Sequence, residues 1–220
     1  MKTVQKITCI IIALTISSFA FAEESPASQS LQPNTKKYGI GASFVRLSVT
    51  ETTAASEEYT YTVSGPAISV LQYYPLGEKL GFSYTMHVGA TIFTQYIETI
   101  GASTTTSNYQ LSDFEFLPAF VNVNALLSYP VLQQEKISLS LGAGAEFGVI
   151  SQTLVSGDPM MVMFLGLAAE ARSYYQMSDN LILTGGANIG LPLYSVGMDP
   201  DNSISGLDFG IFAGAVFNLN

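Results

Sequence analysis

The sequence has 220 residues, of which only 11% are charged, and it combines a formal net charge of −9 with a mean hydropathy of +0.33. A soluble domain normally carries about 25% charged residues, so much of this chain must face something other than water. An acidic chain without a cluster of basic and aromatic residues repels phosphate groups, which excludes nucleic acid from the expected partners.

The N-terminal segment has the features of a secretory signal peptide. Lys2 and Lys6 precede an apolar run, and Ala20 and Ala22 form an A-x-A cleavage site. Removal of this segment takes two of the eight basic residues and none of the 17 acidic ones, so the net charge becomes −11. Cys9 is the only cysteine and is removed as well, so we expect a mature chain without disulfides or cysteine metal ligands.

The rest of the chain offers no candidate for a membrane-spanning helix, which needs roughly 20 apolar residues. The longest apolar run, Met160–Ala169, is stopped by Glu170 and Arg172. Glycine, serine and threonine occur throughout, and they disfavour helices. An apolar exported chain of this kind indicates the other structure that crosses a bilayer, a closed β-barrel whose strands satisfy one another's backbone groups.

Apolar residues alternate with small or polar residues over most of the mature chain. From Ile137 to Val149 every second residue is apolar, and those between are Ser, Gly or Glu. This period of two is typical of strands with one face toward lipid and the other toward a polar lumen. We therefore expect an all-β protein, a closed antiparallel up-and-down transmembrane β-barrel of about eight strands with short periplasmic turns.

The expected organisation is a signal peptide over residues 1–22, a polar N-terminal tail over 23–36 and one barrel domain over 37–220. The strands are expected at Lys37–Thr50, Tyr59–Tyr74, Leu80–Ile97, Leu111–Tyr129, Ile137–Ser151, Met160–Gln176, Leu181–Ser195 and Ser205–Leu219. Two strands have an irregular phase. Arg46 interrupts the outward apolar row of the first, which predicts a bulge or a strand end, and near Pro66 the second has no clear lipid face until Leu71.

Three short polar turns each follow aromatic residues. The stretches YYPLGEKLGFSY from Tyr73, SYPVLQQEKISLSL from Ser128 and YYQMSDNLILTGG from Tyr174 repeat the same order of aromatic residue, turn and alternating strand. Short turns lie on the periplasmic side of outer-membrane barrels, and aromatic rings prefer the membrane interface. The expected periplasmic aromatic belt is Tyr73, Tyr74, Tyr129, Tyr174 and Tyr175.

The other connections begin near Thr50, Glu98, Gln152 and Val196. They are polar and rich in Ser, Thr and Gly, as surface loops are. We expect them to be the extracellular loops, where host or envelope ligands would bind.

The C-terminal sequence FGIFAGAVFNLN carries a family resemblance. Gly214, Phe217 and Leu219 fit the glycine-x-x-hydrophobic-x-hydrophobic assembly signal, although the family usually ends in an aromatic residue. Over nearly all of its mature length the chain resembles the small outer-membrane β-barrel proteins, the superfamily of the OmpA transmembrane domain, OmpX and OmpW. The resemblance implies a place in the outer membrane, contact with its lipids, and recognition of the last strand by the barrel-assembly machinery.

The inward rows contain ionisable residues, and charges inside a membrane barrel are costly unless they are paired. We expect Arg172 to neutralise carboxylates in a plug, with a proton or ion path as the open alternative. The expected lumen charge network is His87, Glu146, Glu170 and Arg172, with Arg46 and Asp208 as further candidates. The inward aromatic residues are expected to be Phe93, Phe120, Phe164 and Phe212.

The expected function is a structural or surface-interaction role, adhesin-like or antigen-like, without enzymatic activity, cofactor or metal. His87 is the only histidine and has no serine two residues away, which disfavours a catalytic triad. Two alternatives stay open. A narrow channel or carrier for small apolar molecules would use the inward phenylalanines, and a soluble periplasmic lipocalin-like barrel would turn the same alternation inside out.

Overall fold

The computed structural model describes residues 35–77, 79–134, 136–155, 159–196 and 202–219. The strands are β1 (Lys36–Thr52), β2 (Glu58–Pro75), β3 (Gly81–Ala90), β4 (Phe93–Ile100), β5 (Ser103–Tyr109), β6 (Ala119–Gln133), β7 (Ile137–Thr153), β8 (Pro159–Gln176), β9 (Leu181–Ser195), β10 (Ser203–Gly206) and β11 (Asp208–Leu219). A short 3-10 helix, η1 (Leu111–Asp113), precedes β6. No helix within the described ranges has the length and hydropathy to cross a bilayer.

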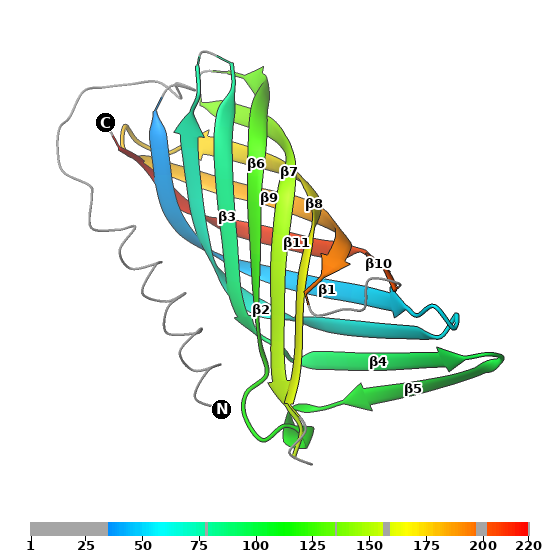
Figure 1. The fold of residues 1–220 in the computed structure, drawn as a ribbon. Coiled ribbons are helices and arrows are strands. Elements are labelled where there is room, and N and C mark those ends of the chain that lie inside the picture. The colour runs from blue at the N-terminus through cyan, green and yellow to red at the C-terminus, as the bar shows by residue number, and fades with distance from the viewer. Residues whose placement is uncertain (1–34, 78, 135, 156–158, 197–201, 220) are drawn as a thin grey trace.

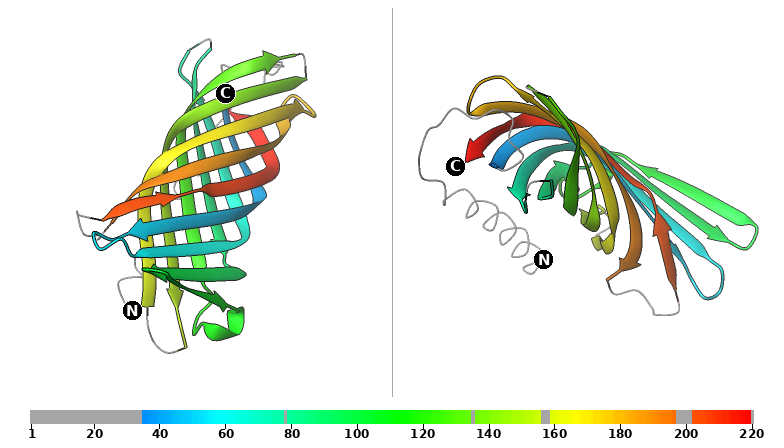
Figure 2. Two further views of the ribbon diagram at one scale, coloured as in Figure 1. Left: turned by 90° about the vertical axis from the view of Figure 1, so that its right-hand side faces the viewer. Right: turned by 90° about the horizontal axis from the view of Figure 1, so that it is seen from above.

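Eight strands close into an antiparallel ring (Figures 1 and 2). Their order is β1, β2, β3, β6, β7, β8, β9 and β11, and β11 returns to pair with β1. Closure leaves no unpaired edge in the wall, as a structure that crosses lipid requires. The expected barrel of about eight strands is confirmed.

The outer face of this ring is apolar. Its side chains alternate with buried ones along each strand, so the row that faces outward is the hydrophobic one. Exposed large apolar residues of the wall include Ile40, Phe44, Ile68, Val88, Leu127, Leu141, Leu165, Leu167, Ile189, Leu191, Phe209 and Ile211. The inverted orientation of a lipocalin-like barrel is therefore wrong.

The first two strands keep their phase, contrary to expectation. β1 pairs without a bulge along both neighbours, and Arg46 simply stands on the outer face. On β2 the outward row includes Pro66 and Ile68, whereas Leu71 is buried in the lumen. The inward side chains of β2 include both polar and apolar residues, so its sequence shows no clean alternation. This is why the sequence suggested an irregularity.

The third expected strand is divided in two. The backbone N–H of Thr91 donates to the carbonyl of Pro118 (2.8 Å), and that of Ile92 donates to the carbonyl of Ser64 (2.9 Å). The chain thus leaves β6 at this point and continues as β4, which pairs with β2 and not with β6. Because the step changes the phase, Phe93 is 41% exposed and does not point inward as expected.

Part of the expected second extracellular loop is a strand. β4 and β5 form a hairpin that turns at Gly101, whose φ is +60°, and β6 begins only at Ala119. β-branched residues favour strands, and Thr99 and Thr104 face each other with hydroxyl oxygens 3.3 Å apart. The hairpin extends away from the barrel together with the extracellular ends of β1 and β2 (Figures 1 and 2).

The last expected strand is also interrupted. Ser203–Gly206 pairs with the end of β1 as β10, and β11 starts after Leu207. Asp208 bridges the break, because its Oδ1 accepts a hydrogen bond from the backbone N–H of Ser48 (2.6 Å).

Side chains fill the lumen in two apolar clusters. The extracellular cluster is Val45, Leu47, Val49, Tyr61, Val63, Ala67, Phe120, Ile150 and Phe164, and the periplasmic cluster is Leu71, Tyr174, Ile182, Phe212 and Val216. Inward glycines make this filling possible. A Cβ at Gly148 would overlap the ring of Phe164, and one at Gly186 would overlap the ring of Phe212. Large and small residues from neighbouring strands thus interlock, as dense packing requires.

This interlock predicts a specific cost for Gly148→Val. The added methyl groups would displace the Phe164 ring, and overpacking of this kind costs about 1–3 kcal/mol of unfolding free energy. Urea unfolding of the folded barrel in lipid micelles would measure the loss. Ala145→Val, on the outward face of the same strand, is the matched control and should change stability by less than about 0.5 kcal/mol.

The contact between Gly148 and the Phe164 ring can be checked with Phe164→Ala. Because this variant opens the space that the new valine needs, the double variant should lose less stability than the sum of the two single losses. Strictly additive losses would contradict the interlock.

Candidate functional site

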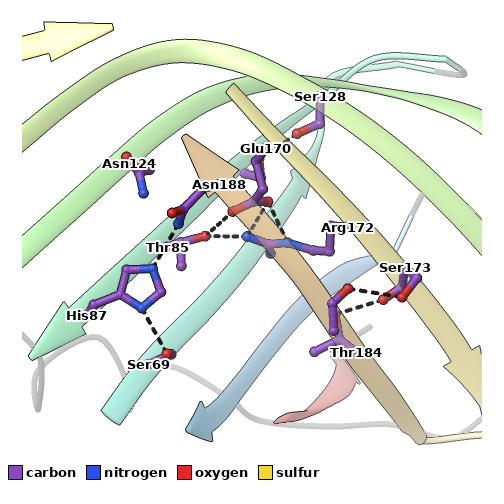
Figure 3. Close-up of polar contacts among 12 residues, drawn as sticks. Ser69, Thr85, His87, Asn124, Ser128, Glu170, Arg172, Ser173, Thr184 and Asn188 are labelled. Atoms are coloured by element: carbon purple, nitrogen blue, oxygen red, sulfur yellow. Dashed lines mark hydrogen bonds and ion pairs between the residues drawn. The ribbon is translucent and has the colours of Figure 1, made fainter. Parts of the chain in front are cut away.

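A polar layer, drawn in Figure 3, lies between the two apolar clusters along the strands, as on β2, where Ser69 stands between Ala67 and Leu71. Its centre is Arg172 on β8, whose Nη2 lies 2.7 Å from Oε1 of Glu170, and whose Nε donates to the same oxygen (2.7 Å). Thr85 on β3 donates to Oε2 of Glu170 (3.0 Å) and accepts from Arg172. The guanidinium carbon also lies 5.2 Å from the ring centroid of Phe212. The buried arginine therefore has an ion-pair partner in Glu170 and an aromatic ring packed against its guanidinium group.

His87 is held separately in this layer and is 0% exposed. Asn188 donates its amide to Nε2 (3.0 Å), which leaves the ring proton on Nδ1. Nδ1 lies 2.9 Å from the hydroxyl of Ser69 and 3.0 Å from that of Ser43. Serine and histidine do meet, across strands, but a side chain with no accessible surface offers no approach to a substrate. The contacts orient His87 as part of the filled lumen.

Glu146 forms a third group, apart from the arginine. Its Oε1 accepts from the amide of Asn122 (2.6 Å), and its carboxyl group lies against that of Asp208. Each of the two carboxyl groups has one oxygen without a donor among the described residues.

The expected network is thus three separate groups. Arg172 pairs with Glu170 and not with Glu146, and Arg46 contributes nothing because it stands on the outer face. The missed members are Thr85, Ser43, Ser69, Asn122 and Asn188. Their partners lie on other strands, so the inward phase marks them as lumen residues but does not say what they contact. Among the described residues, no group of three His, Cys, Asp or Glu side chains could hold a metal ion.

The periplasmic belt is smaller than expected. Tyr129 and Tyr175 stand on the outer face, and Tyr74, on β2, is half-buried on the same outer face. Tyr73 and Tyr174 instead point into the lumen, where their ring centroids are 6.5 Å apart. Adjacent residues of a strand face opposite sides, so a Tyr-Tyr pair cannot place both rings in lipid.

Tyr38 is a member of the outer aromatic group that the sequence pattern did not indicate. Its hydroxyl donates to that of Tyr74 (2.6 Å), and the two rings meet edge to face. Below the lumen-facing rings, the Nζ atom of Lys37 lies 4.8 Å from the centroid of Tyr73. The outer rings of Tyr38 and Tyr74 are thus placed to anchor the barrel at the membrane interface, and the inner rings of Tyr73 and Tyr174 fill the periplasmic end of the lumen.

The residues of the expected assembly signal lie in the closing strand. Gly214 pairs with Gly41, and Phe217 pairs with Tyr38 and Leu181. The backbone of Leu219 pairs with that of Lys36. The cleavage residues Ala20 and Ala22 lie outside the described residues, and recognition by assembly machinery remains a prediction.

The extracellular ends of β1 and β2 form a second region of interest together with β4 and β5. One face of this four-stranded extracellular sheet carries tyrosine and glutamate, and the other carries mostly threonine. We define the tyrosine–carboxylate face as Glu51, Tyr59, Tyr61, Tyr96, Glu98 and Tyr109. The sequence pattern missed this face because it assigned the second half of the hairpin to a loop.

No protein-family model and no curated protein sequence matches this chain. Solved structures do match: OprG from Pseudomonas aeruginosa, an outer membrane protein, has a TM-score of 0.51 at 10% identity and covers 87% of this chain and 100% of its own. OmpT from Escherichia coli, an outer membrane protease, has a TM-score of 0.54 at 8% identity, with coverage of 88% and 100%. Neisserial surface protein A has a TM-score of 0.46 at 14% identity, with coverage of 82% and 97%.

At such identities the likeness concerns the fold alone, and it agrees with the closed ring and the apolar outer face. The chain has the fold of the small outer-membrane β-barrel proteins, and its lipid-facing surface places it in the outer membrane.

Proposed function

We propose that the protein is a plugged outer-membrane barrel that presents its extracellular sheet to molecules outside the cell, without acting as an enzyme. The observation that carries this proposal is the projection of β4 and β5 beyond the barrel, beside the ends of β1 and β2 (Figure 2). A barrel that served only to span the membrane would need no such extension. The extension is built from paired strands, so it holds a fixed surface toward the outside.

The lumen supports a role outside the barrel. Phe120, Ile150 and Phe164 are almost completely buried in its extracellular half. The Arg172–Glu170 pair and the layer around His87 fill the middle. A small barrel whose interior is packed with side chains does not conduct hydrophilic solutes.

The edge of the hairpin is suited to binding. β5 pairs only with β4, so its other edge presents backbone N–H and C=O groups that no described strand uses. Its sequence, STTTSNY, contains neither charge nor proline, the usual protections of an exposed edge. Open edges of this type accept extended peptides by strand addition.

A second candidate function is carriage of small apolar molecules. It is favoured by the separation of β4 from β6, where Ile92, Phe93, Phe116 and Leu117 expose apolar side chains beside the gap in strand pairing. Uptake of a fluorescent apolar probe into proteoliposomes, above the level of empty vesicles, would favour this candidate over surface presentation.

If side chains plug the lumen around the Arg172–Glu170 pair, Arg172→Met should lower the unfolding free energy strongly. The substitution leaves the Glu170 carboxylate buried without its partner, and breaking a buried pair in this way costs about 3–5 kcal/mol. Urea unfolding in lipid micelles would show it. Arg46→Met is the matched control, because it removes an arginine from the outer face and should change stability by about 1 kcal/mol or less.

The double variant Glu170→Leu with Arg172→Met removes both charges and should recover much of the lost stability. A single variant as stable as the wild type would contradict the plug. A steady conductance of the wild-type protein in planar bilayers would do so too, because it would show an open path.

Surface presentation predicts that shortening the hairpin abolishes binding to external surfaces. Replacing residues 97–106 by Asn-Gly lets the Tyr96–Ser107 pair close a two-residue turn and leaves the barrel intact. Cells that display equal amounts of folded barrel would be compared for adhesion to epithelial layers, and the shortened variant should fall to the level of cells without the protein. The control replaces only Gly101-Ala102 by Asn-Gly, which keeps the hairpin. Equal adhesion of the two variants would contradict the proposal.

A further inference from the structure

The tyrosine–carboxylate face brings acidic and aromatic side chains into cross-strand register. Glu51 on β1 pairs with Tyr59 on β2, which pairs in turn with Glu98 on β4. One position further into the barrel, Tyr61 pairs with Tyr96. Residues directly opposite in a sheet point to the same face, so the glutamates flank the rings.

The rings on this face are accessible and ordered relative to one another. Tyr59 and Tyr96 stack with centroids 6.4 Å apart at an interplanar angle of 21°, and both are only half-buried. Tyr61 is 5% exposed, and its hydroxyl has no hydrogen-bond partner among the described residues. A buried polar atom without a partner at the base of an open aromatic surface points to a ligand that is polar and comes from outside.

The charged side chains described on the extracellular side are all acidic. The carboxylates described there are Glu51, Glu57, Glu58, Glu98, Asp113 and Glu115, and none forms an ion pair with a described lysine or arginine. Among the described cations, Lys36, Lys37, Lys79 and Lys136 lie at the periplasmic end, Arg172 lies in the lumen and Arg46 lies on the wall. The extracellular sheet therefore has a negative potential that its own residues do not balance.

Two of these carboxylates are already partly used. Oε1 of Glu51 accepts from the amide of Asn202 (2.7 Å), and Oε2 of Glu57 accepts from the hydroxyl of Tyr59 (2.9 Å). That hydrogen bond raises the pKa of Tyr59. Burial raises the pKa of Tyr96, and the carboxylates of Glu98 and Glu51 raise it further. The same field that resists a tyrosinate attracts a positive group to these rings.

We propose that the tyrosine–carboxylate face binds lysine and arginine side chains of a basic polypeptide from outside the cell. Ammonium and guanidinium groups bind over tyrosine rings and pair with carboxylates, so both components of the face recognise them. A polypeptide is the fitting source, because the open edge of β5 beside the face accepts an extended backbone. This inference rests on the proposed surface-presentation function and names the partner of the same sheet.

The test uses the full-length barrel in lipid nanodiscs and a fluorescent peptide of alternating lysine and threonine, with a glutamate–threonine peptide as the negative probe. Glu98→Gln should weaken binding of the lysine peptide about two- to fivefold. Tyr59→Leu should weaken it about two- to fivefold, whereas Tyr59→Phe, which keeps the ring, should bind close to the wild type. Glu58→Gln is the matched control, since it removes a carboxylate from the opposite face of the same strand.

Several results would overturn the inference. Equal losses for Glu98→Gln and Glu58→Gln would show that only net charge attracts the peptide. Equal losses for Tyr59→Leu and Tyr59→Phe would remove the role of the ring. Spermine could also compete with the fluorescent peptide for the face. If it competes as strongly as unlabelled lysine peptide at equal charge, the occupant is a small polyamine and not a polypeptide.

Cell adhesion separates this inference from the proposed function. If adhesion needs the hairpin but survives in the combined Tyr59→Leu and Glu98→Gln variant and in excess lysine peptide, surface presentation stands and the basic partner is wrong. If adhesion does not need the hairpin, the proposed function itself is wrong, whatever the peptide binding shows.

Discussion

The structure depends on one constraint: backbone groups at membrane depth have no partner in lipid and must bond to each other. β11 meets this constraint, because it pairs with β9 on one side and with β1 on the other and so closes the ring. Closure at eight strands then determines the width of the lumen, which holds side chains and little else. The glycines opposite Phe164 and Phe212, and the pairing of Arg172 with Glu170, are consequences of filling that narrow space.

The sequence was sufficient for the class of fold, because the requirement to face lipid on one side imposes a strict period of two. It placed Glu146, Glu170 and Arg172 in the lumen for the same reason. It could not assign their partners, since Arg172 could reach any inward carboxylate until the register of β7 against β8 is known. The tyrosine doublets show the opposite case, where strict use of alternation would have placed one ring of each pair inside from the start.

The extracellular hairpin was the main error, and its cause is local. Residues 98–110 are rich in Ser and Thr, which are common in loops and also, for Thr, in strands. Only strand pairing decides between the two: β4 pairs with β2, and β5 pairs with β4. The first of these pairings begins where the chain steps away from β6 at Thr91. The step depends on backbone hydrogen bonds to Pro118 and Ser64, which are remote in sequence. No local pattern carries that information.

The distribution of charge links the fold to its proposed role. The extracellular sheet carries carboxylates without a lysine or arginine, whereas the periplasmic turns carry both signs, with Lys79 and Lys136 next to Glu78 and Glu135 in the sequence. In the proposed role the filled lumen carries no solute between these ends, so each end acts on its own side of the membrane. On the outer side, stacked tyrosines, unbalanced carboxylates and an open strand edge occur together on one extension of paired strands. Each of the three would contribute to recognition of an extended, positively charged chain, whereas spanning the membrane needs none of them.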